Sequence, residues 1–466
     1  MVKNNLLSLS ITCIAFCLLL GCSKTDSTLE SVIKRGELRV LTRVDPTTYT
    51  TNKSGVSGFE YDLTTLFANE LGVNVRFIFP DKFHDFLQLT SEHPADFAAA
   101  GLSITQERKK KVLFTPSYYS VTQQLIYHYR TRRPRSIKQI NSSFFEVLAG
   151  TSHAENLAEI KKTQPDLYWT EAYNSNVVEL VGMVNSGMLD YTIADSHQFQ
   201  ILRNQFPMLN AAFDISEPEE IAWAFAKNKD TSLYDEAVKF LDKAKKSGAI
   251  AQLKDKYFGY SKQLNYVGLC TFRRHFKTRL PSLREDFHRA AKKYSLDWLL
   301  LAAVAYQESH WNPDAKSPTG VRGIMMLTKA TAKQMNIENR LEPSQSIDGG
   351  AHYLATRLRK IPSRIAEPDR TWMALASYNI GLGHLEDARI LTQQQGGNPD
   401  KWIDVKKHLP LLADKKWYTT TKHGYARGHE PVTYINNVRQ YLAMLEQLED
   451  NYPPPKNKLK IQLPAL

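Results

Sequence analysis

The hydrophobic pattern of this chain of 466 residues changes its period once, near residues 265 to 275. Before this point, short strand-like runs such as "ELRVL" and "YTIAD" alternate with segments of helical length, which is typical of α/β layers with parallel strands. After it, apolar residues recur at helical spacings. Each part is long enough to bury its own core, so the pattern predicts an α/β domain over residues 22–269 and a mainly α-helical domain over residues 270–466, with a flexible tail from about residue 451.

The first residues have the features of an export signal. Lys3 precedes an uncharged run that ends at Gly21 and is shorter than the roughly 20 residues of a membrane-spanning helix, so we predict a signal peptide over residues 1–21. The run ends in "LLGC", which resembles the lipobox of bacterial lipoproteins and implies acylation of Cys22. Ser23 stands where an aspartate would signal inner-membrane retention. We therefore expect the mature chain at the inner leaflet of the outer membrane, on its periplasmic face; attachment through the protein surface is the alternative.

Charge and cysteine content limit the partners. The net charge of +12 and the pI near 9.2 favour a polyanion, such as nucleic acid, anionic lipid or an acidic cell-wall polymer, or indicate only a basic, soluble surface. The sequence has no phosphate-binding glycine loop before a helix and no HExxH spacing among its histidines, so we expect no nucleic acid, metal or other cofactor. Cys270 would be the one cysteine left without lipid, and we expect a small buried apolar residue there.

The α/β half contains a set of residues suited to a small zwitterion. In "GLSITQERKKK", the hydroxyls of Ser103 and Thr105 precede Arg108, whose planar guanidinium can bind a carboxylate at two points. Asp195, at the end of the strand-like "YTIAD", could meet an ammonium group. These charges indicate an amino acid or the end of a peptide as ligand; alternatively, Arg108 simply belongs to the solvated basic run that continues through Lys109.

Residues 38 to about 260 resemble family 3 periplasmic solute-binding proteins of the amino-acid-binding type. The resemblance rests on three segments in order, "FEYDLTTLFANELG", "AGLSITQERKKKVLFTPSYY" and "GMLDYTIAD". It implies two lobes separated by a cleft, with Ser103, Arg108 and Asp195 as ligand contacts.

The helical half places an acid on an apolar stripe. Glu308, in "AYQESHWNP", follows Leu301, Val304 and Ala305 at spacings of seven, four and three residues. Burial raises the pKa of a carboxyl group, which then stays protonated near neutral pH, as a general acid in glycoside cleavage must. The alternative is a structural glutamate that is paired near a helix end.

Residues suited to sugars follow Glu308. Gly320 and Gly323, in "GVRGIMML", would let the backbone approach a ligand without interference from a Cβ atom. Tyr378 and Asn379, in "ASYNIG", and Tyr434, in "YINNV", offer rings and an amide, which stack on and hydrogen-bond to sugars.

The order "ESHWNPDAKSPTGVRGIMML", "ASYNIG", "YINNV" closely resembles the lytic transglycosylase domain related to goose-type lysozyme. It implies cleavage of the bond between N-acetylmuramic acid and N-acetylglucosamine in peptidoglycan, with a 1,6-anhydromuramoyl product. Asp297, eleven positions before Glu308, would be about 16 Å away on one helix, so the sequence offers no evident second acid. Many relatives carry glutamine where this chain has Met326, and we expect Met325 and Met326 to face the core.

Two functions of different classes remain at this point. The first is an exported peptidoglycan lytic transglycosylase in which Glu308 is the only acid and base and an N-terminal module binds a cell-wall peptide or amino acid and regulates the enzyme. The second is a lipid-anchored periplasmic receptor for amino acids or peptides, whose helical half docks on peptidoglycan without cleaving it. Trp311 and Tyr306 are either groove residues or core residues in both cases.

Overall fold

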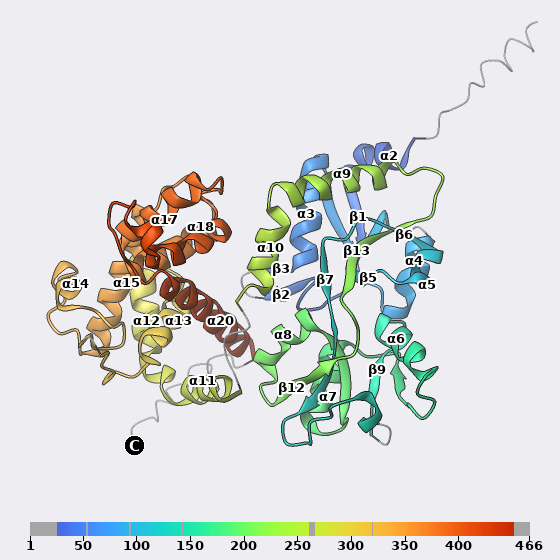
Figure 1. Ribbon diagram of the computed structural model, residues 1–466, viewed down its shortest axis with the longest axis horizontal. Helices are drawn as coiled ribbons and strands as arrows, with labels where there is room; N and C mark the ends of the chain where they lie inside the picture. The colour runs from blue at the N-terminus through green and yellow to red at the C-terminus, as the bar shows by residue number, and fades with distance from the viewer. Residues whose placement is uncertain are drawn as a thin grey trace, which may run out of the picture.

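The structure is a computed structural model that describes residues 26–52, 55–92, 95–140, 143–260, 266–318 and 320–451. The predicted signal peptide, Cys22 and the tail beyond residue 451 lie outside the described residues. The described chain forms an α/β half and a helical half that lie side by side (Figure 1). In the described ranges, no helix is both long enough and apolar enough to cross a membrane.

The first lobe of the α/β half is built on a mixed six-stranded sheet. Its order is β4-β1-β5-β13-β6, and β7 also pairs with β13. The strands are β1 (Glu37–Leu41), β4 (Asn74–Ile78), β5 (Phe97–Ser103), β6 (Val112–Phe114), β7 (Tyr119–Val121) and β13 (Glu219–Ala226). Only β1, β4 and β5 are parallel, because β13 returns from the second lobe and runs antiparallel to β5, β6 and β7. The prediction of parallel strands is therefore wrong for half of this sheet.

Helices cover this sheet, and the small hairpin of β2 (Thr50–Asn52) and β3 (Gly55–Ser57) lies beside it. The helices are α2 (Thr28–Arg35), α3 (Phe59–Leu71), α4 (Phe86–Ser91), α5 (Gln106–Lys111), α9 (Ser232–Lys246) and α10 (Ala249–Phe258). In α3, apolar residues four apart, Phe59, Leu63 and Phe67, are fully buried in the core of this lobe. The helix ends at Gly72, whose φ of 71° favours glycine.

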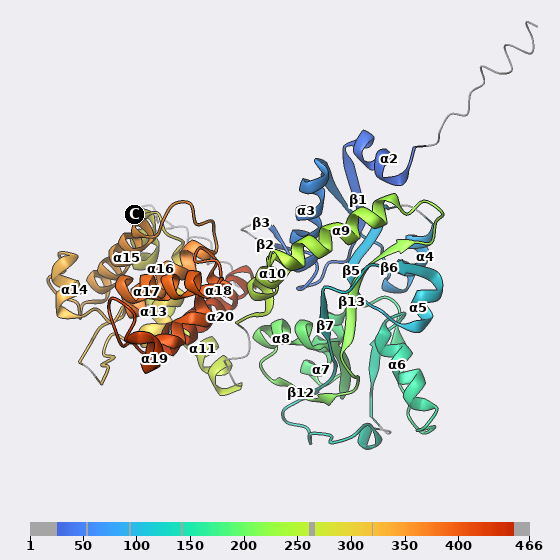
Figure 2. The same ribbon diagram turned by 45° about the horizontal axis from the view of Figure 1, so that its top comes forward.

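The second lobe has an antiparallel sheet of order β11-β8-β12, so the parallel prediction is wrong here as well. Its elements are β8 (Gln123–His128), β9 (Glu146–Leu148), α6 (Ser152–Lys161), β10 (Thr170–Ala172), α7 (Val177–Ser186), β11 (Tyr191–Asp195), α8 (Ser196–Gln205) and β12 (Leu209–Asp214). Strands β9 and β10 form a separate parallel pair. The chain crosses between the lobes after β7 and again before β13, which confirms the two-lobed architecture (Figure 2).

The helical half has one large core in which α13 is central. Its helices are α11 (Tyr266–Thr278), α12 (Leu280–Tyr294), α13 (Trp298–Ser309), α14 (Lys329–Gln334), α15 (Pro343–Lys360), α16 (Asp369–Ile380), α17 (Leu382–Gln394), α18 (Trp402–His408), α19 (Lys415–Tyr418) and α20 (His429–Asn451). Asp297 caps α13 by accepting a hydrogen bond from the Leu299 N–H, and residues 300–306 are all buried. The apolar run therefore becomes a helix enclosed on all sides.

The boundary that we predicted at residues 269 and 270 falls inside α11. Leu269 belongs to the core of the helical half, and α11 already begins at Tyr266. We propose placing the boundary between Tyr260 and Tyr266 instead. Cys270, in the same helix, is half-buried rather than buried, because it lies at the edge of this core.

Helix α20 connects the two halves. On the described residues, Arg439 of α20 donates a hydrogen bond of 2.9 Å to Asp255 of α10, and Lys406 of α18 also pairs with Asp255. Arg273 of α11 donates to the Gln205 carbonyl at the end of α8 over 2.7 Å. Both views place α20 between the other helices of the helical half and the α/β half (Figures 1 and 2). The buried ion pair and the carbonyl contact give the halves a defined relative position.

Candidate active site and ligand cleft

Glu308 lies in the last turn of α13, near two tyrosines that belong to other helices. Tyr434 of α20 donates a hydrogen bond of 2.7 Å from its Oη to Glu308 Oε1. Tyr378 of α16 is close enough that the Glu308 charge adds to burial in raising the pKa of this tyrosine. Three helices that are far apart in sequence therefore meet at one carboxyl group.

Burial raises the pKa of Glu308 from 4.5 to about 7, although the hydrogen bond from Tyr434 acts in the opposite direction. The surface of the residue is largely but not completely covered, so the group is both desolvated and reachable. A carboxyl group in this state is protonated in a large fraction of molecules at neutral pH. It can donate that proton and later accept another.

A cavity of about 380 Å³ opens beside Glu308. It is lined by Gln307, Asn379, His429, Glu430, Thr433 and Tyr434. Of these, the sequence predicted Asn379 and Tyr434. Glu430, Thr433 and Tyr434 are spaced by three and four residues, so they share one face of α20. Sequence reasoning missed Glu430 and Thr433, because the helical period alone does not show which face of a helix lines a groove.

The loop of residues 316–318 and 320–327, which we refer to as the strap, contacts the active site through Tyr378. Its Met325 carbonyl accepts a hydrogen bond of 3.1 Å from Tyr378, and the Met325 N–H donates to Ser346 over 3.2 Å. At Gly323, where φ is 87°, a Cβ atom would lie 2.1 Å from the Arg340 carbonyl oxygen. The close approach at Gly323 is therefore to the chain itself, and this placement does not support it as a substrate contact.

The other residues that we considered for the groove have separate positions. Trp311 and Tyr306 are core residues, and the Trp311 indole donates to the Ala302 carbonyl over 2.8 Å, which fixes the turn after α13. Met325 is fully buried, as expected, whereas Met326 is only partly buried and has a φ of 46°. Gly320 lines a different cavity on the outer side of the strap.

Other carboxylates near Glu308 in sequence or space differ from it. Asp297 caps the opposite end of α13, and Asp314 is exposed in the turn that follows the helix. Glu430 lines the groove, but it is 58% exposed at its side chain and forms an ion pair with Arg427 at 3.1 Å. Glu308 is therefore the groove carboxylate whose surroundings favour the protonated form.

In the α/β half, Arg108 lies between the lobes and is 2% exposed. Its Nε donates to Glu155 of the opposite lobe over 2.8 Å, and its two terminal nitrogens donate to the carbonyls of Ser103 and Gly150 over 3.3 and 3.1 Å. Arg108 is thus not part of a solvated basic run. Its charge is met by a carboxylate of the chain itself.

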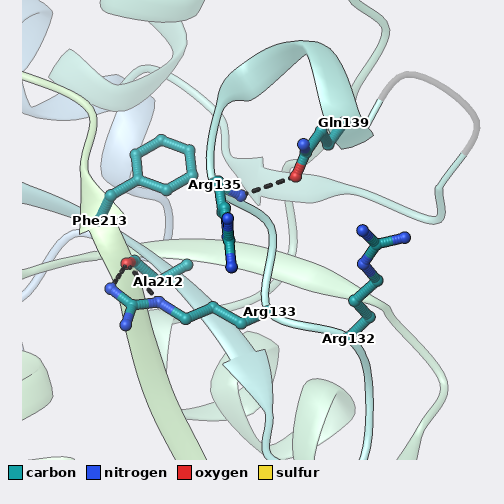
Figure 3. A pocket seen from close by; sticks show the side chains of 6 residues that line it. All are labelled: Arg132, Arg133, Arg135, Gln139, Ala212 and Phe213. Atoms are coloured by element: carbon teal, nitrogen blue, oxygen red, sulfur yellow. Dashed lines mark hydrogen bonds between the residues drawn. The ribbon is translucent and has the colours of Figure 1, made fainter.

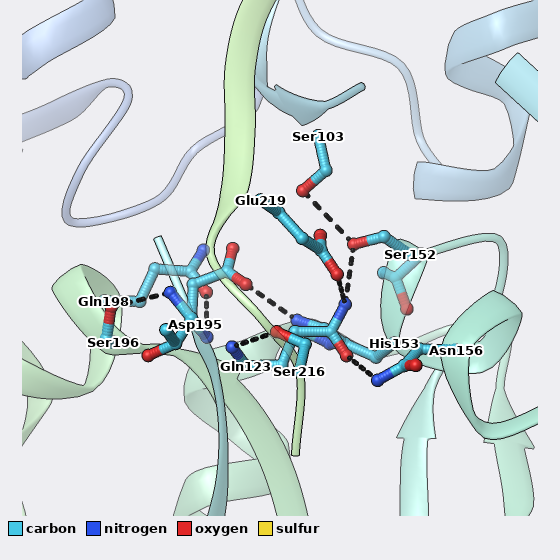
Figure 4. A network of polar contacts seen from close by, with 12 residues as sticks. Ser103, Gln123, Ser152, His153, Asn156, Asp195, Ser196, Gln198, Ser216 and Glu219 are labelled. Carbon is cyan, nitrogen blue, oxygen red and sulfur yellow. Dashed lines mark hydrogen bonds and ion pairs between the residues drawn. The ribbon is translucent and has the colours of Figure 1, made fainter. Parts of the chain in front are cut away.

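Asp195 and Ser103 are also buried at the cleft (Figure 4). Asp195 Oδ1 is 2.9 Å from His153 Nε2, and although burial opposes ionisation, the nearby His153 lowers the pKa of Asp195 to about 2. Ser152 donates to Ser103 over 3.3 Å across the cleft. The structure therefore brings the three predicted ligand contacts together, and α6 supplies an imidazole to Asp195 and a carboxylate to Arg108.

A separate cavity of about 500 Å³ lies in the second lobe, next to β12 (Figure 3). It is lined by Arg132, Arg133, Arg135, Gln139, Ala212 and Phe213. Arg133 donates to the Ala212 carbonyl, so its orientation is fixed. As for metals, the described ranges contain no cluster of three or more His, Cys, Asp or Glu side chains that could bind an ion.

Family models match segments in both halves of the chain. Residues 38–260 match the model of bacterial extracellular solute-binding proteins, family 3, and residues 285–401 match the transglycosylase SLT domain. A solved structure of the arginine-binding protein from T. maritima, a P235GK mutant, aligns with a TM-score of 0.45 and 23% identity, covering 50% of this chain and 99% of that one.

Relatives align with almost the whole chain. The membrane-bound lytic murein transglycosylase F of Saccharophagus degradans is 47% identical over 423 residues, covering 91% of this chain and 84% of its own length. The protein of the same name from Pseudomonas fluorescens is 45% identical over 431 residues, covering 92% and 89%. With a solute-binding domain followed by a transglycosylase SLT domain and this identity over its length, the chain belongs to the membrane-bound lytic murein transglycosylase F family.

Proposed function

We propose that this chain cleaves the β-1,4 bond between N-acetylmuramic acid and N-acetylglucosamine in peptidoglycan and leaves 1,6-anhydromuramoyl ends. The observation that carries the proposal is the desolvated Glu308 carboxyl group, held by Tyr434 at the edge of a groove; its burial raises its pKa to about 7. A single carboxyl group that titrates near neutral pH can act first as acid and then as base. Family membership favours this enzyme over a receptor that only docks on peptidoglycan.

In the first step, protonated Glu308 transfers its proton to the bridging oxygen while the bond from C1 of the muramoyl sugar to that oxygen breaks. The carbonyl oxygen of the substrate's own N-acetyl group stabilises C1, which takes the place of a second carboxylate. In the second step, ionised Glu308 removes the proton from the C6 hydroxyl, and O6 forms the bond to C1. The proton is thus returned to Glu308, and no water is consumed.

Tyr434, Tyr378 and Asn379 would position the reacting parts. Tyr434 orients the Glu308 carboxyl group through its 2.7 Å hydrogen bond, and it also stabilises the ionised form between the two steps. Tyr378 connects the strap to the site through Met325. Asn379 is exposed in the groove, where its amide can bind an N-acetyl group.

Digestion of purified peptidoglycan sacculi tests this function. We expect soluble muropeptides that end in 1,6-anhydromuramic acid, identified by liquid chromatography and mass spectrometry. Products with reducing muramic acid ends would instead indicate hydrolysis by water. Binding to sacculi without any product would favour the receptor with a docking domain.

We also propose that the N-terminal module binds a small carboxylate-bearing ligand, such as a free amino acid or a cell-wall peptide. The ligand would displace Glu155 from Arg108 and His153 from Asp195, because these side chains occupy the two charges that suit a zwitterion. Bound ligand could act on catalysis because α20 contacts both Asp255 of the module and Glu308 through Arg439 and Tyr434.

The variant Glu155→Gln should therefore bind a soluble stem tetrapeptide more tightly than the wild-type chain does. Loss of the competing carboxylate frees Arg108, and a gain of about tenfold corresponds to one charge-assisted hydrogen bond. Isothermal titration calorimetry measures the affinity, and Glu159→Gln, in an exposed pair on the same helix, is the matched control. Unchanged or weaker binding by this variant would contradict competition by Glu155.

Regulation is tested separately, by measuring turnover of the wild-type chain with a saturating panel of cell-wall peptides. Unchanged turnover would contradict regulation by the N-terminal module.

The membrane attachment is a further part of this proposal. We propose that the mature chain is acylated at Cys22 and faces the periplasm from the outer membrane, in line with the "membrane-bound" in the names of its relatives. Mass spectrometry of the mature N-terminus tests the acylation. An unmodified Cys22 in a membrane-associated chain would favour attachment through the protein surface.

A further inference from the structure

The outer side of the strap carries an open, strongly basic cavity of about 730 Å³ that no step of the proposed reaction uses. Five of its lining residues are cations and one is a carboxylate: Lys316, Arg322, Lys329, Lys333, Arg340 and Glu338. Apolar side chains, including Ile337 and Leu341, complete the lining. A cavity of this size is large enough for several residues of a peptide.

The cations of this basic cavity are available to a ligand. Arg340 is fixed in place, because its guanidinium donates to the carbonyls of Leu327 and Gly320 on the strap. The four others, at positions 316, 322, 329 and 333, are exposed and form no ion pair with a described carboxylate. Their excess positive charge therefore favours an anion with several carboxylates.

The strap contributes residues to the basic cavity and also contacts Tyr378 of the active site. Its inner side carries Met325, whose carbonyl accepts the Tyr378 hydrogen bond beside Glu308. Its outer side carries Arg322, which pairs in the backbone with both Lys316 and Leu327. Gly323 of the strap packs against the backbone of Arg340, which lines the basic cavity. This contact fixes the position of the strap relative to the basic cavity.

We infer that the basic cavity binds the carboxylates of a peptide stem on the glycan strand that lies in the groove. This rests on the proposed function, because the muramoyl sugars of peptidoglycan carry acidic peptides through their lactyl groups. The glycan lies on the Glu308 side of the strap, and the stem passes to the outer side. The apolar lining contacts the methyl groups of the stem, while the lysines and arginines pair with its carboxylates.

The double variant Lys329→Gln/Lys333→Gln tests this inference. The variant loses two exposed ion pairs with the stem. We therefore expect KM for stem-bearing glycan strands to rise about threefold to tenfold while kcat is unchanged. For the same strands after an amidase has removed the stems, KM stays at the wild-type value. Added salt should reduce the wild-type preference for stem-bearing strands, because these charges are exposed.

The matched control is Lys292→Gln/Lys360→Gln, which removes two exposed lysines from α12 and α15 of the same half. It should leave both KM values unchanged. An equal rise of KM on both substrates, or no rise on either, overturns the inference. If the wild-type chain cleaves neither substrate, the proposed function fails instead, so the two failures are distinguishable.

Discussion

Glu308→Gln should reduce the formation of 1,6-anhydromuramoyl products by at least about 10³-fold, because the amide can neither donate nor accept the proton in either step. Glutamine keeps the shape of the side chain and can still accept the Tyr434 hydrogen bond, so binding to sacculi should persist. Product formation is measured on purified sacculi by mass spectrometry. Wild-type activity in this variant would reject the assignment of the acid.

Two control variants sharpen this result. Glu285→Gln removes an exposed glutamate of α12 and should be fully active. Glu430→Gln changes the other groove carboxylate, which is exposed and paired with Arg427, and a single-glutamate mechanism predicts a far smaller loss there than at Glu308. A loss at Glu430 as large as that at Glu308 would indicate two acting carboxylates.

Glu308→Gln should also change how activity and stability depend on pH. Because the acid must be protonated, wild-type activity should fall as pH rises above about 7. The pKa of Glu308 is higher in the folded state than the 4.5 expected in the unfolded state, so the folded state binds this proton more tightly. The contribution of this group to the stability of the fold is therefore greatest below pH 4.5 and decreases until about pH 7. At pH 8, the free energy of unfolding of Glu308→Gln should therefore exceed that of the wild-type chain by up to about 3 kcal/mol. At pH 4.5 we expect no such gain. Calorimetric unfolding of the helical half at both pH values measures this change in stability.

Asp255→Ala should destabilise the contact between the two halves by about 3 to 5 kcal/mol. The substitution leaves Arg439, which is 4% exposed, and Lys406 without their carboxylate in a buried interface. We expect the halves to unfold in separate calorimetric transitions and to become sensitive to proteases near residue 260.

Asp242→Ala is the matched control for this prediction. Asp242 pairs with Lys246 on the surface of α9, and its side chain is 57% exposed, so its loss should cost less than about 0.5 kcal/mol. Equal effects of the two substitutions would show that the Asp255 pair does not determine the relative position of the halves.

The prediction of the fold succeeded where the signal is local. The periods of 2 and 3.6 residues identified the strands, the helices and the change between residues 265 and 275, because side-chain burial follows these periods directly. Strand direction failed at β13 and in the second lobe, since antiparallel return of a strand depends on long-range pairing. The predicted boundary falls inside α11, because Leu269 packs into a core formed by residues far along the chain.

The site shows the same division. The stripe of Glu308 with Leu301 and Val304 was sufficient to predict a desolvated carboxyl group. Whether Tyr434 would reach it was not contained in the sequence, because their contact spans 126 residues. The close packing of Gly323 against the Arg340 carbonyl has the same cause, because only the fold of the strap brings these two residues together.

The sequence alone determined the types of the elements, the family resemblance of both halves and the acid on its apolar helix, because these follow from residue order and local spacing. Only the tertiary structure decided which groups meet: Arg108 with Glu155, Asp195 with His153, Asp255 with Arg439, and the basic cavity with the outer side of the strap. The physical reason is that charge pairing and desolvation depend on distances of a few ångströms between residues far apart in the chain, and only packing sets those distances.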